Sequence, residues 1–188
     1  DNRSSRGLVD VYKRQILLII FFGLITSCSS NQSMKPQDFK DKKPRLVIEE
    51  YLSGNVKAWG ILQNRSGKVT RQFSATLNGN WDGKKLILDE KFNWDDGEVQ
   101  DRQWHITKLD EHNYEGTASD VVGKAKGYSY GPAFKFEYVL LVPVKGKEIK
   151  ITFDDWIFMQ DEKVAINRAK MTKFGFKVAE LTVFFVKE

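Results

Sequence analysis

The sequence predicts an all-β protein whose antiparallel strands, about 8–10 in number, close into an up-and-down barrel. Three observations support this prediction. Apolar and polar residues alternate with a period of two, turn-forming residues separate the alternating runs, and no long stretch has the period of a helix. The 188 residues are 41% hydrophobic and 29% charged, which is enough apolar material for one core and too much for a disordered chain.

The N-terminal region has the composition of a secretory signal. An apolar run over residues 16–25 follows Lys13 and Arg14. At about 1.5 Å per residue, a helix of this length is too short to cross a hydrocarbon core of roughly 30 Å. The only cysteine, Cys28, ends a segment that resembles a bacterial lipobox, in which the cysteine carries a diacylglycerol thioether. We therefore predict a signal helix within a signal peptide at 1–27 and a lipid anchor on Cys28, with a buried free thiol as the alternative.

The residues around this signal indicate a location. Ser29 stands in place of the aspartate that usually retains lipoproteins in the inner membrane, so the resemblance implies the periplasmic face of the bacterial outer membrane. Residues 1–15 contain no Met and fit a signal start poorly, so we expect an artefactual extension there. Residues 28–43 are polar, which predicts a lipidated tether before a barrel domain at 44–188.

The predicted barrel domain contains a series of alternating runs. In chain order, the clearest stripes lie at 69–77, 86–94, 102–106, 114–120, 134–142, 149–153, 164–168 and 181–185. Turn residues such as Asp82-Gly83 and Lys145-Gly146 separate them at intervals of roughly 10–15 residues, which is typical of sequential hairpins. Each run is expected to turn one face to a core and the other to solvent.

One segment, 161–173, is ambiguous. Ala165, Ala169 and Met171 fit the period of a helix, whereas Val164 and Ile166 alternate as in a strand. We favour the strand because of this alternation.

An antiparallel meander of this size must protect its two edge strands, and closure into a barrel removes them. Eight to ten strands enclose roughly enough space for side chains and one small ligand. We therefore predict a lipocalin-like barrel, with an open sandwich as the alternative.

Four charged residues share strand faces with apolar residues and are therefore expected inside. They are Arg102, Asp120, Asp155 and Arg168. Burying a charge is costly unless it is paired, so two internal ion pairs are one interpretation. The other is a head-group site, because arginine binds carboxylate or phosphate in a bidentate fashion.

In the head-group interpretation, aromatic residues complete the site. Tyr138 would assist the arginines, Trp104 shares the face of Arg102, and the stripe at 134–142 would line a pocket for an apolar tail. The predicted ligand is lipid-like or similar to a fatty acid.

Several other classes of function lack support in the sequence. One cysteine and two histidines predict no metal site, and no cofactor is expected. No serine elbow accompanies His105 or His112, so no catalytic residue is assigned. Asp154 and Asp155 alternate to opposite faces, unlike a glycosidase pair. The basic residues are not clustered densely enough for a nucleic-acid partner.

A set of short turn and tryptophan motifs resembles a known family. The motifs include Ala58-Trp59-Gly60, Gly79-Asn80-Trp81, Arg102-Gln103-Trp104, Asp120-Val121-Val122-Gly123 and Asp154-Asp155-Trp156. Together they are similar to proteobacterial lipoproteins grouped as domain of unknown function 3833. The resemblance implies a lipocalin-like fold and an envelope location, and it brings no established activity, ligand or catalytic residue.

Three functions follow as expectations. The first is a non-enzymatic lipoprotein that binds a small amphiphile in the barrel. The second is a structural or accessory lipoprotein, with a filled barrel and an unidentified protein partner. The third is an enzyme of lipid chemistry that uses the inward charges. An open interior would favour the first and a filled interior the second.

Overall fold

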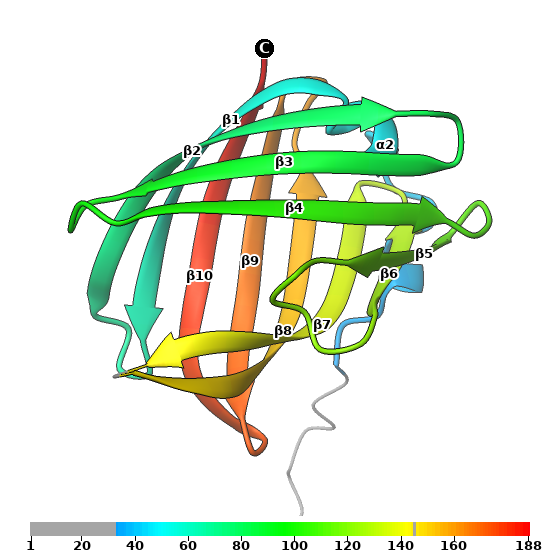
Figure 1. Cartoon of the computed structure of the whole chain (residues 1–188). Coiled ribbons are helices and arrows are strands. Elements are labelled where there is room, and N and C mark those ends of the chain that lie inside the picture. Colours follow the sequence, from blue (N-terminus) through cyan, green and yellow to red (C-terminus); the bar gives the residue numbers. More distant parts are fainter. Residues whose placement is uncertain (1–32, 145) are drawn as a thin grey trace, which may run out of the picture. The chain divides into compact units, whose positions relative to one another are not determined.

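Ten antiparallel strands form a closed barrel in the part of the chain that the computed structural model describes, residues 33–144 and 146–188 (Figure 1). This confirms the predicted all-β barrel. The strands are β1 (Gly54–Asn64), β2 (Val69–Trp81), β3 (Lys85–Trp94), β4 (Val99–Lys108), β5 (Asn113–Thr117), β6 (Ala125–Tyr130), β7 (Ala133–Val144), β8 (Lys147–Met159), β9 (Val164–Lys173) and β10 (Phe176–Lys187).

Each strand pairs with the next along the chain, and β10 returns to pair with β1. The ambiguous segment 161–173 contains the strand β9, as we favoured. Its preceding turn is stabilised by Asp161, whose Oδ1 accepts hydrogen bonds from the backbone N–H groups of Lys163 and Val164, both at 2.8 Å. Closure leaves no unpaired edge between β1 and β10.

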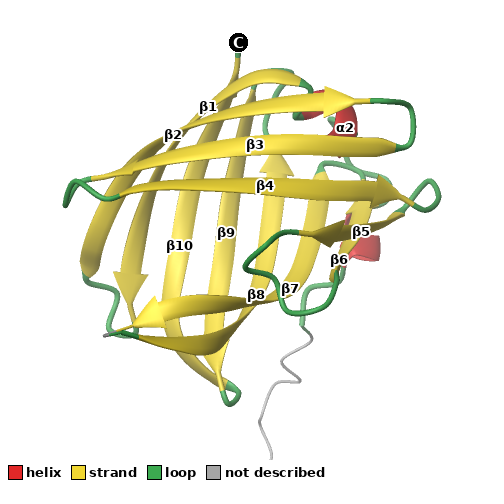
Figure 2. Cartoon of the chain, in the orientation of Figure 1, coloured by secondary structure: helices red, strands yellow, loops and turns green. Residues whose placement is uncertain are grey.

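Because the strands alternate in direction, successive connections lie at opposite ends of the barrel. One end, here called the open end, carries the connections 64–69, 94–99, 117–125, 144–147 and 173–176. The other, here called the closed end, carries the connections 81–85, 108–113, 130–133 and 159–164, together with the short helix α2 (Ile48–Tyr51), drawn in red in Figure 2.

An apolar plug fills the closed end. Leu46, Ile48 and Leu52, which flank and form α2, are at most 4% exposed. The plug lies in direct contact with β2. A Cβ atom at Gly79 would lie only 2.0 Å from the carbonyl oxygen of Leu52. Only glycine allows this close approach, so the sequence of β2 is matched to the plug.

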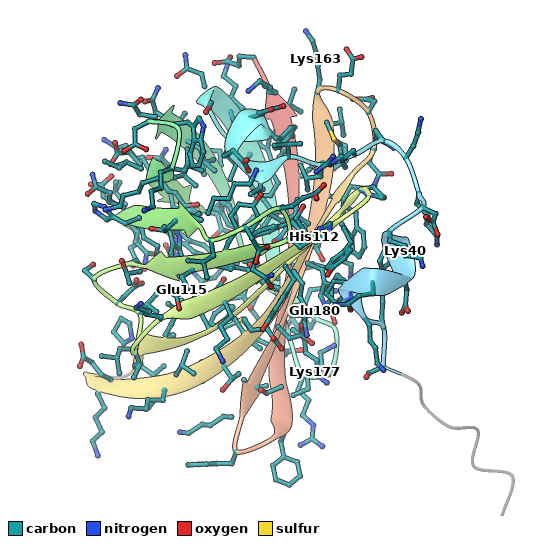
Figure 3. All side chains as sticks on the ribbon, turned by 90° about the vertical axis from the view of Figure 1, so that its right-hand side faces the viewer. Lys40, His112, Glu115, Lys163, Lys177 and Glu180 are labelled. Carbon is teal, nitrogen blue, oxygen red and sulfur yellow. The ribbon has the colours of Figure 1, made fainter. Side chains whose placement is uncertain are left out.

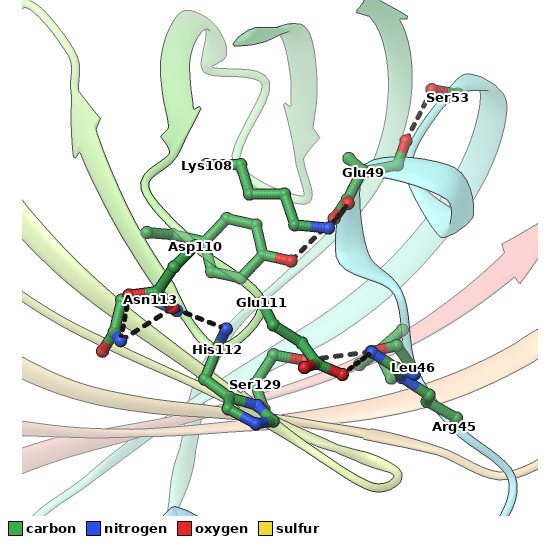
Figure 4. Close-up of polar contacts among 11 residues, drawn as sticks. Arg45, Leu46, Glu49, Ser53, Lys108, Asp110, Glu111, His112, Asn113 and Ser129 are labelled. Carbon is green, nitrogen blue, oxygen red and sulfur yellow. Dashed lines mark hydrogen bonds and ion pairs between the residues drawn. The ribbon is translucent and has the colours of Figure 1, made fainter. Parts of the chain in front are cut away.

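Polar contacts fasten the plug to the barrel wall (Figure 4). The carboxylate of Glu49 accepts hydrogen bonds from Nζ of Lys108, at 2.5 Å, and from the hydroxyl of Tyr114, at 2.8 Å. Burial alone would raise the pKa of Glu49, but the hydrogen bonds from Lys108, its own backbone and Tyr114 outweigh burial and lower it. The hydroxyl of Ser129 donates to the carbonyl of Leu46 at 3.0 Å.

The segment before the plug also lies on the barrel. A short 3-10 helix, η1 (Pro36–Phe39), contacts β6 and β7, and the Phe39 ring lies 5.4 Å from that of Phe158 and 6.1 Å from that of Trp156. The compact unit begins at Lys35 and includes this segment, while the predicted division at residue 44 between tether and barrel domain stays a prediction. The predicted signal peptide and Cys28 lie outside the described residues.

Candidate ligand-binding site

Two adjoining hollows occupy the barrel interior. The inner one has a volume of about 100 Å³ and reaches the plug, where Ile48 and Leu52 line it. The outer one has a volume of about 230 Å³ and extends to the open end, where it is lined by residues such as Trp94 and Pro143. Both hollows share the lining residues Phe73, Phe92, Arg102, Tyr138 and Leu181. The interior is therefore not packed solid.

A larger hollow of about 590 Å³ lies on the outer surface along β1 to β4. Outward polar side chains such as Asn55, Lys57 and Asp89 line it, and they already face solvent. We consider the interior pair the better candidate, because ligand sites are usually concave and mostly apolar with a few converging polar groups.

An ion pair crosses the interior where the two hollows meet. Nε and Nη2 of Arg102 both donate to Oδ2 of Asp120, at 3.0 and 2.8 Å. Nη1 of Arg102 lies 3.8 Å from Oε2 of Glu90 on the neighbouring strand β3. The Arg102 side chain is 15% exposed, so this guanidinium is largely withdrawn from water and already has two carboxylate partners.

A second polar group lies beside the first. The hydroxyl of Tyr138 donates to Oδ2 of Asp155 at 2.9 Å. The side-chain amide of Asn167 donates to Oδ1 of the same carboxylate, and also to the carbonyl of Trp156 at 3.1 Å. Both oxygens of Asp155 are thus held by neutral donors rather than by a cation.

Aromatic rings form the apolar wall around these groups. The Trp104 ring lies 5.1 Å from that of Phe136 and 5.3 Å from that of Tyr138, and Tyr138 stacks on Phe153 at 5.0 Å. Trp104 is 4% exposed, so its main role is packing. This dry wall lowers the local dielectric constant and strengthens the electrostatic interactions of the polar groups.

The polar cluster, defined as Glu90, Arg102, Asp120, Tyr138, Asp155 and Asn167, contains more acid than base. Burial raises the pKa of Glu90 to about 7, although Arg102 opposes the shift. Burial likewise raises the pKa of Asp155 to about 6, against the hydrogen bonds from Asn167 and Tyr138. Three carboxyl groups therefore face one guanidinium, and two of them release their protons only near neutral pH.

Three buried polar atoms of the outer hollow have no hydrogen-bond partner among the described residues. They are one acceptor, Oδ1 of Asp120, and two donors, Nε1 of Trp94 and Nε of Arg71. Such atoms are uncommon in folded proteins because each costs desolvation free energy. All three atoms are available to a molecule that enters the hollow from the open end.

Five of the six predicted site residues come together as expected: Arg102, Trp104, Asp120, Tyr138 and Asp155. The prediction for Arg168 is wrong. Its side chain is 62% exposed and pairs with Glu180 on the outside of the barrel.

The face of β9 explains this error. The inward residues of β9 are the small Ala165, Asn167 and Ala169, so Ile166 lies outside, next to Phe184 and Phe158 on the adjacent strands. The apolar Ile166 on the outer face therefore led to the expectation that this face of β9, with Arg168 on it, lies inside.

Sequence reasoning missed Glu90 and Asn167. Glu90 follows Leu86 and Leu88 at a spacing of two, which was a signal for an inward position. No comparable signal marked Asn167, because its position depends on the face of β9.

Two other kinds of site have no support in the described ranges, 33–144 and 146–188. No group of three or more His, Cys, Asp or Glu side chains there could hold a metal ion. No helix in these ranges is long and apolar enough to span a membrane.

The sequence matches one family model over residues 22–187, nearly the whole chain. The chain belongs to the DUF3833 family. This family is described as proteins of unknown function, so membership confirms the resemblance and adds no activity. No curated protein matches the sequence.

Solved structures similar to this DUF3833 protein support the fold alone. A DUF3598 protein of unknown function from Nostoc punctiforme has a TM-score of 0.58 at 14% identity, over 78% of this chain and 51% of its own. This chain thus spans about half the length of the Nostoc protein. The S-type phycobiliprotein lyase CPES from Guillardia theta has a TM-score of 0.54 at 8% identity, over 74% of this chain and 90% of its own.

Proposed function

We propose that this DUF3833 protein binds a small amphiphilic molecule inside its barrel, with the polar end at the polar cluster and the apolar part in the outer hollow. The observation that carries the proposal is a hollow that leads from the open end to a buried polar cluster. The unpartnered Oδ1 of Asp120 and Nε1 of Trp94 give the ligand two hydrogen-bonding positions.

The charges of the cluster favour a ligand whose polar end donates hydrogen bonds or carries a positive charge. A fatty-acid carboxylate would need a free inward cation, but Arg102 is already paired with Asp120 and Glu90, and Arg168 lies outside. At the open end, Arg71 is paired with Asp96 and Glu98. An anion would therefore meet guanidinium groups whose charge is already balanced by two carboxylates each, whereas an amine or hydroxyl meets the vacant acceptor Oδ1 of Asp120. The unpartnered donors Nε1 of Trp94 and Nε of Arg71 suit the oxygen of a hydroxyl.

The size of the hollows favours a short ligand. Sites for drug-sized ligands usually have volumes of about 300–1,000 Å³. The two volumes here, about 100 and 230 Å³, are each below that range, and residues such as Leu140, Phe153 and Met171 give the outer hollow its apolar lining. An alkyl chain of modest length is therefore a suitable apolar part.

A competition assay with three ligands of equal chain length tests this proposal. A neutral fluorescent probe, N-phenyl-1-naphthylamine, is bound first and then displaced by octylamine, octanol or octanoate. We expect octylamine to displace the probe at the lowest concentration and octanoate at the highest. Binding of octylamine should strengthen between about pH 6 and pH 8, because the carboxylates of Glu90 and Asp155 become ionised over that range. Preferential displacement by octanoate would contradict the proposed ligand class.

Two arginine variants and one carboxyl variant sharpen this assay. Glu90→Gln should weaken octylamine binding, and Arg102→Gln should widen the difference between octylamine and octanoate, because it removes the guanidinium that balances the inward carboxylates. Arg168→Gln is the matched control, because this arginine lies on the outer face and should leave all three affinities unchanged. If the probe does not bind to the folded wild-type protein, the interior does not take up amphiphiles and the proposal fails.

We also propose that a lipid on Cys28 anchors the protein to the periplasmic face of the outer membrane. The lipobox-like segment before the cysteine and the serine after it support this location. Two fatty chains hold a protein firmly, because each buried methylene contributes about 0.8 kcal/mol. Labelling with radioactive palmitate should mark the wild-type protein and not Cys28→Ser. Equal labelling of both proteins would exclude the anchor.

A further inference from the structure

We propose that the open end of the barrel docks on an anionic lipid surface through a basic-aromatic rim. The rim is formed by the tips of three hairpins and consists mainly of Arg65, Lys68, Lys147, Lys173, Phe174 and Phe176. This interaction concerns the outer surface, so it does not depend on what binds inside the barrel.

Two exposed phenylalanines form the tip of the β9–β10 hairpin. Phe174 is 88% exposed and Phe176 is 70% exposed. Phe174 also has a φ of 51°, in the left-handed region that large side chains other than asparagine or aspartate rarely adopt. Neither core packing nor turn geometry therefore accounts for a phenylalanine at this tip. An apolar ring that protrudes from a surface is suited to the boundary between lipid head groups and acyl chains.

Basic side chains surround these rings on the neighbouring hairpins. Since β10 pairs with β1 and β9 with β8, the β9–β10 tip lies between the β1–β2 and β7–β8 tips. In the segments 64–69, 144–148 and 173–177, Glu148 is the only acidic residue.

The rim cations are also available for new contacts. In the described ranges, Arg65, Lys68, Lys147 and Lys173 make no ion pair, whereas Lys177 pairs with Glu180 at 2.5 Å. Each basic residue near an anionic membrane strengthens binding about fivefold, so several together give a substantial attraction.

One of the two remaining connections of the open end, the β3–β4 tip, has the opposite character. The β3–β4 tip contains Asp95, Asp96 and Glu98, and two of these carboxylates hold Arg71 at 2.7 and 2.8 Å. The charges of the open end are therefore asymmetric, and an anionic surface would attract the β9–β10 side. Two rings that protrude from one tip make no flat, close-packed apolar face of the kind protein interfaces need, whereas a fluid lipid surface accommodates them.

A fluorescent probe at the tip tests this docking. The full-length chain carries Cys28→Ser, which removes any anchor and the only other thiol, and Phe174→Cys labelled with the environment-sensitive dye NBD. Vesicles of phosphatidylglycerol and phosphatidylcholine should shift its emission to shorter wavelength, and lipids with a doxyl group in the acyl chain should quench it. The same dye at Lys163→Cys should not respond, because Lys163 lies in the connection between β8 and β9 at the closed end. Figure 3 shows it at the opposite end of the barrel from Lys177, which follows the rim residue Phe176 in the sequence.

Charge variants provide the second arm of this experiment. Lys68→Gln combined with Lys173→Gln should lower the vesicle partition coefficient measured at the tip by about 25-fold, fivefold for each lost charge. Lys163→Gln, at the closed end, is the matched control and should leave it unchanged. Three results would each overturn the proposal: no response at position 174, an equal response with phosphatidylcholine alone, or a shift without vesicles that grows with protein concentration. The last result would indicate a second copy of the chain on the rim.

Discussion

The two ends of the barrel differ in how their polar and apolar groups are used. At the closed end, apolar side chains such as Ile48 are fully buried, and the carboxylate of Glu49 is held by both Lys108 and Tyr114. At the open end, Phe174 projects into solvent and Trp94 has a buried N–H without a partner in the described part of the chain. The comparison shows that the closed end satisfies its buried groups and stabilises the fold. The open end instead has apolar and polar groups without partners in the described part of the chain.

The polar cluster lies between these two regions and shares properties with both. Asn167 is buried like the residues of the plug and the other members are partly buried, yet the acceptor Oδ1 of Asp120 remains unpaired within the described ranges, as at the open end. Unpaired buried groups reduce stability, and natural proteins tend to keep them where a ligand or a reaction needs them. Three substitutions, one in each region, test this division.

The largest effect is expected at the closed end. Ile48→Ala removes a fully buried side chain from the plug, and we expect the free energy of unfolding to fall by about 2–5 kcal/mol. Val144→Ala, a matched truncation at the open end, should change it by less than about 0.5 kcal/mol because Val144 is 41% exposed. Urea unfolding curves of both variants measure the difference. Equal losses would show that the two ends do not differ in this way.

An intermediate effect with a defined pH dependence is expected in the polar cluster. Because burial raises the pKa of Glu90 to about 7, the folded protein holds a proton there that the unfolded chain has released. Ionised Glu90 therefore disfavours folding above its folded pKa, and this penalty disappears as the pH falls below the unfolded pKa.

Glu90→Gln should remove that penalty. Relative to wild type, the variant should gain roughly 1–3 kcal/mol of stability on going from about pH 5 to about pH 8. Thermal or urea unfolding at both pH values measures this gain. A stability difference that does not vary with pH would mean that Glu90 titrates as an ordinary surface carboxylate.

The smallest effect is expected at the open end. Phe174→Asn places a residue that tolerates the left-handed region at φ 51°, and it removes an exposed ring without creating a cavity. We expect the protein to be unchanged or up to about 1 kcal/mol more stable. A marked loss of stability in a thermal melt would show that the ring packs against the barrel, which would weaken the case for a free rim.

Much of the fold could be predicted because large apolar side chains alternate strictly in most strands. Phe134 and Phe136 lie inside, as their stripe indicated, and Arg102, Trp104 and Tyr138 reach the same interior. Turn residues then fixed where each strand ends, so the closed meander followed from local signals.

The remaining errors concern information that a period of two does not contain. Alternation separates two faces but does not say which one is inside, and in β9 the outward Ile166 is flanked by Phe184 and Phe158 from neighbouring strands. The docking of η1 also depends on a tertiary contact, that of Phe39 with Trp156, which a polar local sequence does not reveal. The inward position of Glu90, by contrast, could have been predicted from the alternation that places Leu88 inside.

The pairing of β1 with β10 means that the first and last strands depend on each other. Lys187, near the end of the chain, donates hydrogen bonds to the carbonyl groups of Glu50, Tyr51 and Ser53, at 2.9, 2.9 and 2.7 Å. During synthesis, β1 therefore cannot pair with β10 and close the barrel until the residues of β10 have been made. A chain truncated before β10 would expose the edges of β1 and β9, and such edges invite association with other chains.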